Sequence, residues 1–76
     1  MKPKFAAQLK FGDRCWFEIG SGVTYVYLCH RPLKHVEEFA YFRFYDMNTD
    51  RLHKLYMNTA NIVWILEDNE PTRTTT

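Results

Sequence analysis

The cysteine and histidine residues carry the most reactive side chains of this 76-residue chain: Cys15, Cys29, His30, His35 and His53. One chemistry they could support is metal binding. A structural zinc site needs four ligands, usually in closely spaced pairs such as C-x2-C. Cys29 and His30 are adjacent, and adjacent side chains of a strand point to opposite faces. The spacing therefore argues against a metal site, and we expect neither a metal nor another cofactor.

Nucleophilic catalysis is the second chemistry that these residues could perform. The Cys29 thiol would need one of the three histidines as a base and a third group to orient that base. The sequence shows no such group, and it has no Gly-rich phosphate loop because residues 20–22 suit a hairpin turn. We therefore expect no catalytic residues, and a protein that is not an enzyme.

Binding fits the composition better than catalysis, because aromatic residues make up 17% of the chain and fall in strand-like runs. Residues i and i+2 of a strand share one face. If Phe17, Val26 and Phe42 point inward, the aromatic residues between such positions point outward. Soluble monomers seldom expose a patch of this kind, so it predicts an interaction surface. The residues predicted to bind a partner are Trp16, Tyr25, Tyr27, Tyr41, Arg43, Tyr45 and Tyr56.

Residues 14–19 and 22–30 read as the first hairpin of the fold. Gly20 and Ser21 suit a two-residue type II′ turn. That turn pairs Cys15 with Val26 and places Trp16 on the outer face, opposite Tyr25. It also puts Cys15 and Cys29 on opposite faces, which makes a disulfide between them unfavourable.

Residues 38–45 and 51–57 read as a second hairpin around a turn rich in Asp and Asn. Pairing Phe42 with Leu55 and Phe44 with His53 keeps the apolar residues on one face. Residues 31–37 interrupt the strand pattern at Pro32. Because binding residues concentrate on loops, we interpret this stretch as a possible specificity loop that contains Arg31, Lys34 and His35.

The remaining segments complete an all-β prediction for a single small domain. Residues 61–67 are apolar on both faces, as in a doubly covered strand or a subunit seam. Residues 1–11 form a lead-in with a short helix, since Phe5 and Leu9 lie four apart. Residues 68–76 are polar and are predicted to be a disordered tail. The sequence thus predicts a five-stranded small barrel over residues 12–67.

The predicted order of short strands resembles that of SH3-like and Sm-like barrels. Residues 54–67, KLYMNTANIVWILE, resemble the closing turn and strand of Sm-like proteins. That resemblance implies an RNA-binding protein that assembles into rings by pairing the last strand with a neighbouring subunit. We transfer no site residue on this basis.

The net charge of +1 favours a protein partner over nucleic acid, because binding to nucleic acid depends on neutralising phosphates. We therefore expect an adaptor or inhibitor that also self-associates, since a chain this small gains stability from association. Two alternatives remain: binding of single-stranded RNA or DNA, and a small-ligand site at subunit seams. Lysines interrupt residues 1–20, and no apolar run is long enough to cross a bilayer, so we expect a cytoplasmic protein without a membrane partner.

Overall fold

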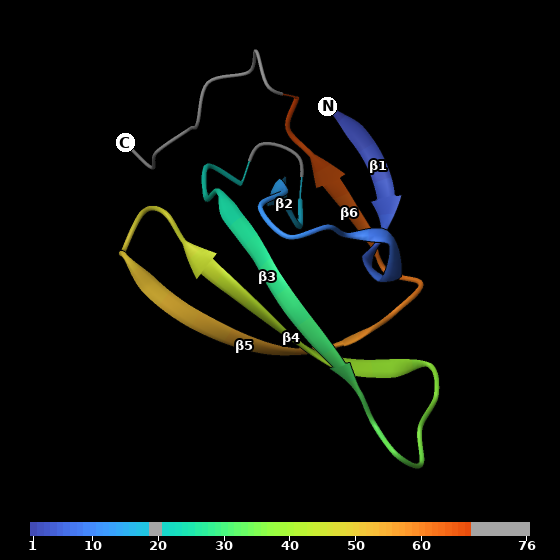
Figure 1. Cartoon of the computed structure of the whole chain (residues 1–76). Coiled ribbons are helices and arrows are strands. Elements are labelled where there is room, and N and C mark those ends of the chain that lie inside the picture. The colour runs from blue at the N-terminus through green and yellow to red at the C-terminus, as the bar shows by residue number, and fades with distance from the viewer. Residues whose placement is uncertain (19–20, 68–76) are drawn as a thin grey trace.

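The computed structural model describes residues 1–18 and 21–67, which form one antiparallel sheet of six strands (Figure 1). The strands are β1 (Lys2–Phe5), β2 (Arg14–Trp16), β3 (Tyr25–Pro32), β4 (Phe39–Asp46), β5 (Arg51–Asn58) and β6 (Ile62–Ile65). Their order in the sheet is β1-β6-β2-β3-β4-β5, so β1 and β5 are the two edges. The all-β prediction is confirmed, but the five-stranded closed barrel is wrong, because the sheet has a sixth strand and remains open.

The predicted N-terminal helix is also wrong. β1 pairs with β6 from Lys2↔Ile65 to Phe5↔Ile62, and a single 3-10 turn, η1 (Ala6–Gln8), follows it. The turn is held to the segment before β6 by a 2.8 Å hydrogen bond from Ala6 N to Asn61 O. The spacing of Phe5 and Leu9 suggested a helix, but pairing with a strand distant in sequence determines the structure here.

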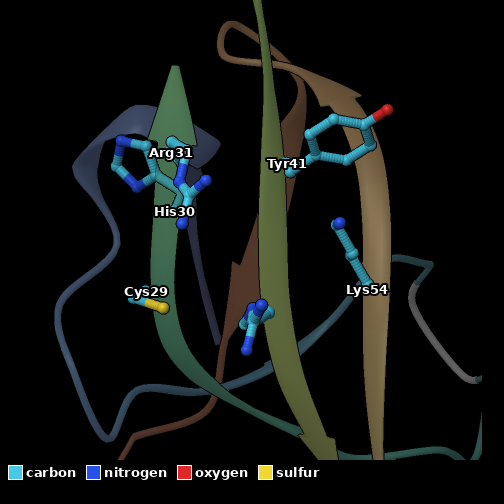
Figure 2. Close-up of a pocket in the computed structure, with 6 residues that line it drawn as sticks. Cys29, His30, Arg31, Tyr41 and Lys54 are labelled. Atoms are coloured by element: carbon cyan, nitrogen blue, oxygen red, sulfur yellow. The ribbon is translucent and has the colours of Figure 1, made fainter. Parts of the chain in front are cut away.

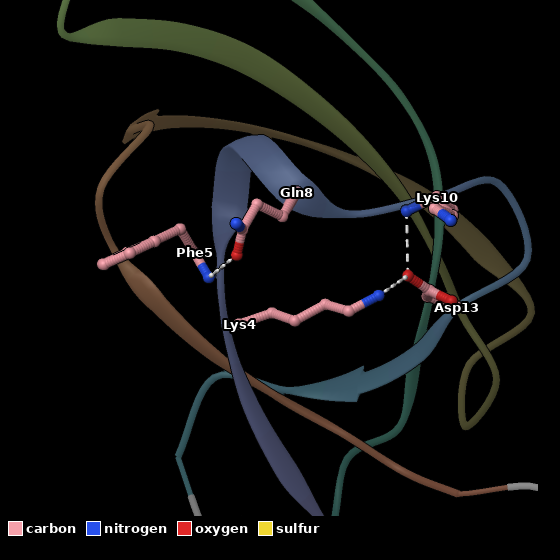
Figure 3. Close-up of polar contacts among 5 residues, drawn as sticks. All are labelled: Lys4, Phe5, Gln8, Lys10 and Asp13. Carbon is pink, nitrogen blue, oxygen red and sulfur yellow. Dashed lines mark hydrogen bonds and ion pairs between the residues drawn. The ribbon is translucent and has the colours of Figure 1, made fainter.

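Polar contacts hold the N-terminal segment to the start of β2 (Figure 3). The Asp13 carboxylate accepts a 2.8 Å hydrogen bond from Lys10 N, and Lys4 Nζ lies 3.5 Å from the same oxygen. Phe5 N donates to Gln8 Oε1 at 3.3 Å, across the 3-10 turn. These contacts fix the chain as it passes from the sheet edge into β2.

The second hairpin, β4–β5, has the predicted register. Phe42 pairs with Leu55 and Phe44 with His53. The turn between the strands is closed by a 2.9 Å hydrogen bond from Asp50 N to Asp46 O, and Asp50 has a positive φ of 57°. Asp and Asn tolerate this left-handed conformation better than most residues, which explains the composition of the turn.

The first hairpin departs from the prediction by one residue. Cys15 pairs with Tyr25 instead of Val26, and β2 ends at Trp16, which pairs with Trp64 of β6. A shift of one residue exchanges the two faces of a strand. Tyr27 is consequently buried in the core, at 6% exposure, and does not point outward as predicted. Trp16 remains on the side of β2 opposite Cys15, but it is buried there too, at 3% exposure, in contact with Thr24. The proposed type II′ turn includes residue 20 and lies outside the described residues.

A β-bulge at Leu28 divides β3 into two halves. Tyr27 pairs with Phe44, but the next pair is Cys29 with Arg43, so Leu28 is the extra residue. Before the bulge, Tyr25 and Tyr27 face the core. Beyond it, His30 faces inward and stacks on Phe42, with a centroid distance of 4.8 Å. A 2.6 Å hydrogen bond between Tyr27 Oη and His30 Nδ1 spans the bulge. The bulge therefore turns Cys29 and Arg31 outward on the same strand.

The core lies between the inner face of β3–β5 and the strands β2 and β6. Its buried members are Ala6, Leu9, Cys15, Tyr27, Ala40, Phe42, Phe44 and Val63. Phe17 packs edge-on against Phe44 at a centroid distance of 4.9 Å. Within the described residues no helix is long and apolar enough to cross a membrane. The predicted tail at residues 68–76 lies outside the described part, and the division between residues 1–11 and 12–67 stays a prediction.

Candidate functional site

The candidate site is the outer face of β3, β4 and β5, on the side of the sheet away from the core. We define the outer face by the outward-pointing residues of these strands: Val26, Leu28, Cys29, Arg31, Phe39, Tyr41, Arg43, Tyr45, Leu52, Lys54 and Tyr56. Three of them are cationic and four are aromatic. Strict alternation along β4 and β5, together with the bulge in β3, produces this segregation.

Strand pairing arranges the outer face in rows. One row runs Cys29–Arg43–Lys54 and the next runs Arg31–Tyr41–Tyr56. A cationic row thus lies beside a row with two aromatic rings.

Ring contacts connect these rows to each other and to Phe39. Lys54 Nζ lies over the Tyr41 ring, 4.4 Å from its centroid, which is a cation–π contact. Phe39 stacks on Tyr56 with parallel rings at 5.0 Å, and Tyr41 lies 5.4 Å from Tyr56. Tyr56, Tyr41 and Phe39 therefore form a contiguous aromatic platform.

A hollow of about 310 Å³ opens on this face (Figure 2). It is lined by Cys29, His30, Arg31, Tyr41, Arg43 and Lys54. Figure 2 shows these side chains coming from three neighbouring strands, with the Lys54 side chain directed towards Tyr41. The hollow thus combines three cations with an aromatic wall. An anionic group attached to a planar ring would find both kinds of contact there.

A second hollow of about 280 Å³ lies towards the turn between β4 and β5. It shares Cys29, Arg43 and Lys54 with the first and adds Leu28, Leu52 and His53. Leu52 is 70% exposed and gives this end of the outer face an apolar character. The face therefore changes from cationic and aromatic to apolar along the strands.

None of the residues that define the outer face is acidic. Asp13 and Glu67 lie beside Lys4 and Lys2, at 3.5 Å and 3.8 Å. Asp50 lies in the turn, where the Tyr45 hydroxyl donates a hydrogen bond to it. That hydrogen bond, with a smaller effect of burial, raises the pKa of Tyr45. The near-zero net charge of the chain therefore does not describe the outer face, which is locally positive.

Asp46 points inward and is a structural residue of the turn. Its carboxylate accepts hydrogen bonds from Asn48 N at 2.8 Å and Thr49 N at 3.3 Å, and lies 3.4 Å from His53 Nε2. Burial alone raises the pKa of Asp46, but these hydrogen bonds and the nearby histidine together bring the pKa below its usual value. Across residues 1–18 and 21–67, no three His, Cys, Asp or Glu side chains gather as a metal site requires.

The structure brings some of the predicted binding residues together and separates others. Tyr41, Arg43, Tyr45 and Tyr56 share the outer face, whereas Tyr25 and Tyr27 face the core. Trp16 is buried outside the core cluster, where its Nε1 donates a 3.1 Å hydrogen bond to Thr24 Oγ1. Of the predicted specificity loop, Arg31 belongs to β3 and lies beside Tyr41. Lys34 and His35 are exposed in the connection between β3 and β4.

Sequence reasoning did not include Cys29, Lys54 or Phe39 among the site residues. The alternation that identified Tyr41 and Tyr56 also contains Lys54 and Phe39, so this signal was present in the sequence. The position of Cys29 depends on the bulge, which no local pattern revealed. Comparisons of the chain with protein-family models, with curated proteins and with solved structures give no match.

Proposed function

We propose that the protein binds single-stranded nucleic acid on the outer face of β3–β5. The observation that carries the proposal is the row of cations, Arg43 and Lys54, beside the ring of Tyr41 and the stacked pair Tyr56–Phe39. Proteins that bind single strands combine a positive groove for the backbone with aromatic side chains for the bases. The outer face supplies both on strands of a rigid sheet.

The expected binding energy and its salt dependence follow from the rings and cations of the outer face. Stacking of one base on an exposed ring contributes about 1–3 kcal/mol. Each phosphate that a cation neutralises adds about −0.7 to the slope of log affinity against log salt for a single strand. Arg31, Arg43 and Lys54 therefore predict a slope of about −2.

The face is unsuited to duplex recognition as its main function. Duplex-binding proteins carry basic residues in excess over a wide surface, whereas this chain has ten Lys and Arg against nine Asp and Glu. Flat, exposed rings such as Tyr41 and Tyr56 stack on unpaired bases, which a duplex does not offer. We therefore expect single strands to bind better than duplex of the same sequence.

The test is fluorescence anisotropy with a labelled oligonucleotide of about 15 nucleotides, a length suited to small β-domains, titrated over a salt series. Tyr41→Ala should weaken binding by about 5- to 100-fold through lost stacking. Arg43→Ala should weaken it and also reduce the salt slope by about 0.7. Arg51→Ala is the matched control, because Arg51 is an exposed cation of β5 whose position in the pairing belongs to the opposite face.

Two results would contradict the proposal. The first is the absence of binding at low salt by a protein shown to be folded. The second is an equal loss of affinity in Arg51→Ala and Arg43→Ala, which would indicate a general charge effect without a defined face.

A protein partner is the second candidate, and the apolar end of the outer face favours it. Leu52 is 70% exposed beside Leu28, and an unpaired base gains little from aliphatic side chains. A partner segment with an apolar anchor and acidic flanks would fit this end. Its binding would depend on Leu52, so Leu52→Ser would weaken it while leaving oligonucleotide affinity unchanged.

A further inference from the structure

The two edges of the open sheet differ in how well they are protected against further strand pairing. β1 is four residues long and contains Pro3 between two lysines. Proline and lysine at an edge oppose pairing with another chain. β5 is eight residues long, contains no proline and, among the described residues, pairs only with β4. β5 is therefore the edge open to a further strand.

The charged side chain in the middle of β5 also points away from this edge. Lys54 is the central cation of the strand, but its ammonium group lies over the Tyr41 ring, back across the sheet. Its neighbours on the outer face are Leu52 and Tyr56, which are 70% and 52% exposed. An edge with a long strand and exposed apolar side chains is expected to pair with another strand.

We propose that two copies of the chain pair antiparallel through β5, on a two-fold axis at Leu55. In a two-fold pair of antiparallel strands, one residue must face its own copy. An axis at Lys54 or at Leu55 gives the longest overlap of the eight-residue strand. The axis at Lys54 would place Lys54 opposite Lys54, and like charges directly opposite are destabilising. The axis at Leu55 instead places Lys54 opposite Tyr56 of the second copy, so that no two like charges face each other across the axis.

This pairing would extend the outer face across both copies. Residues opposite each other in a sheet point to the same side, so the outer faces of the two copies would lie on one side. The row Cys29–Arg43–Lys54 of one copy would continue into the second copy's row with Tyr56, Tyr41 and Arg31. The inference stands on the edge of the sheet and does not depend on the ligand of that face.

Light scattering coupled to size-exclusion chromatography tests the stoichiometry on protein freed of nucleic acid. The expected mass is twice the 9.2 kDa of one chain. Cysteine cross-linking tests the register, in a Cys29→Ser background that removes the exposed native thiol. Lys54→Cys mixed with Tyr56→Cys should give a mixed disulfide on oxidation, because these positions face each other across the axis.

Each cysteine variant alone is the matched control. With the axis at Leu55, position 54 lies two residues along the strand from its own copy, as does position 56. Two residues span about 6.8 Å along a strand. With the separation between the two strands added, the Cα atoms lie farther apart than the limit of about 7 Å for a disulfide. A monomer by light scattering would overturn the proposal. Disulfides that form as readily within each variant as in the mixture would also overturn it.

Discussion

The two cysteines show how strongly the position of a residue in this sheet sets its chemistry. Cys15 is fully buried in the core, and burial, with a smaller effect of Asp13, raises the pKa of its thiol to about 12. Cys29 is exposed in the cation-lined hollow of the outer face. They lie on opposite faces, as predicted, but the predicted register was one residue off, and the bulge at Leu28 brings Cys29 back to the outer face. Since the thiolate is the reactive form, the two thiols should differ sharply in reactivity.

Thiol labelling can therefore report occupancy of the proposed site. In the folded protein, a maleimide should modify Cys29 rapidly and leave Cys15 unmodified, whereas both should react in denaturant. A saturating single-stranded oligonucleotide should slow the labelling of Cys29 by tenfold or more, since the thiol lines the hollow. The measurement is mass spectrometry over a time course, with Cys29→Ser as the blank. Labelling of Cys29 at the same rate with and without bound oligonucleotide would place the ligand elsewhere.

Cys15 also predicts how stability depends on pH. Its pKa rises from 9.0 to about 12 on folding, so below pH 9 the thiol is protonated in both states and stability is complete. Between these values only the unfolded chain ionises, and the free energy of unfolding falls by about 1.4 kcal/mol per pH unit. Burial raises the pKa of Tyr25 and of Tyr27, so both tyrosines act in the same direction at higher pH.

Urea denaturation at half-unit steps from pH 8 to pH 11 measures this slope. Cys15→Ala should be less stable throughout, because it loses packing in the core, but its stability should be flatter between pH 9 and pH 10. In the lower half of that interval an unfolded tyrosine is still mostly protonated, so the thiol of Cys15 dominates the slope there. If the free energy of unfolding fell equally steeply with pH in the variant and the native chain, Cys15 would not control the loss of stability at alkaline pH.

At the scale of elements, the two hairpins show what the sequence could and could not predict. In β4 and β5, aromatic and charged residues alternate with Phe42 and Phe44, so only one register buries the apolar set. In β2 and β3, Tyr and Val occupy alternate positions and both faces are apolar. The one-residue shift that buries Tyr27 in place of Val26 therefore costs little in hydrophobic burial. The assumed two-residue turn then selected the wrong alternative.

The bulge at Leu28 is the element that separates the inward tyrosines of β3 from its outward Cys29 and Arg31. Deleting Leu28 would join the two halves of β3 without changing which face any other residue occupies. We expect a folded variant that loses less than about 2 kcal/mol, because Leu28 is only half-buried and full burial of a leucine contributes about 1.5–3 kcal/mol. Urea denaturation measures this loss.

Deletion of Val26 is the control for the Leu28 deletion. It would force Tyr27 to the outer face and break its hydrogen bond to His30, so a larger loss is expected. If the two deletions were equally destabilising, the bulge would not be the extra residue that the pairing indicates.

At the scale of the whole molecule, the N-terminal segment completes the core. Ala6 and Leu9 are buried among residues of β2, β4 and β6, and β1 covers the free side of β6. The sequence could not predict this role, because the partner of β1 lies about sixty residues away and neither strand carries a distinctive alternation. A short lead-in to an independent domain was the simpler interpretation of residues 1–11.

Two substitutions close together in the chain test whether the whole fold depends on this segment. Leu9→Ala should lower the free energy of unfolding by about 2–5 kcal/mol, the usual cost of truncating a buried leucine. Phe11→Ala is the matched control, since Phe11 is larger but 79% exposed, and it should change stability by less than about 0.5 kcal/mol.

A chain that begins at residue 10 should unfold altogether, because a small domain has only about 5–15 kcal/mol to lose. Thermal unfolding followed by circular dichroism measures all three, and a truncated chain that melts cooperatively near the native temperature would show that residues 12–67 fold independently.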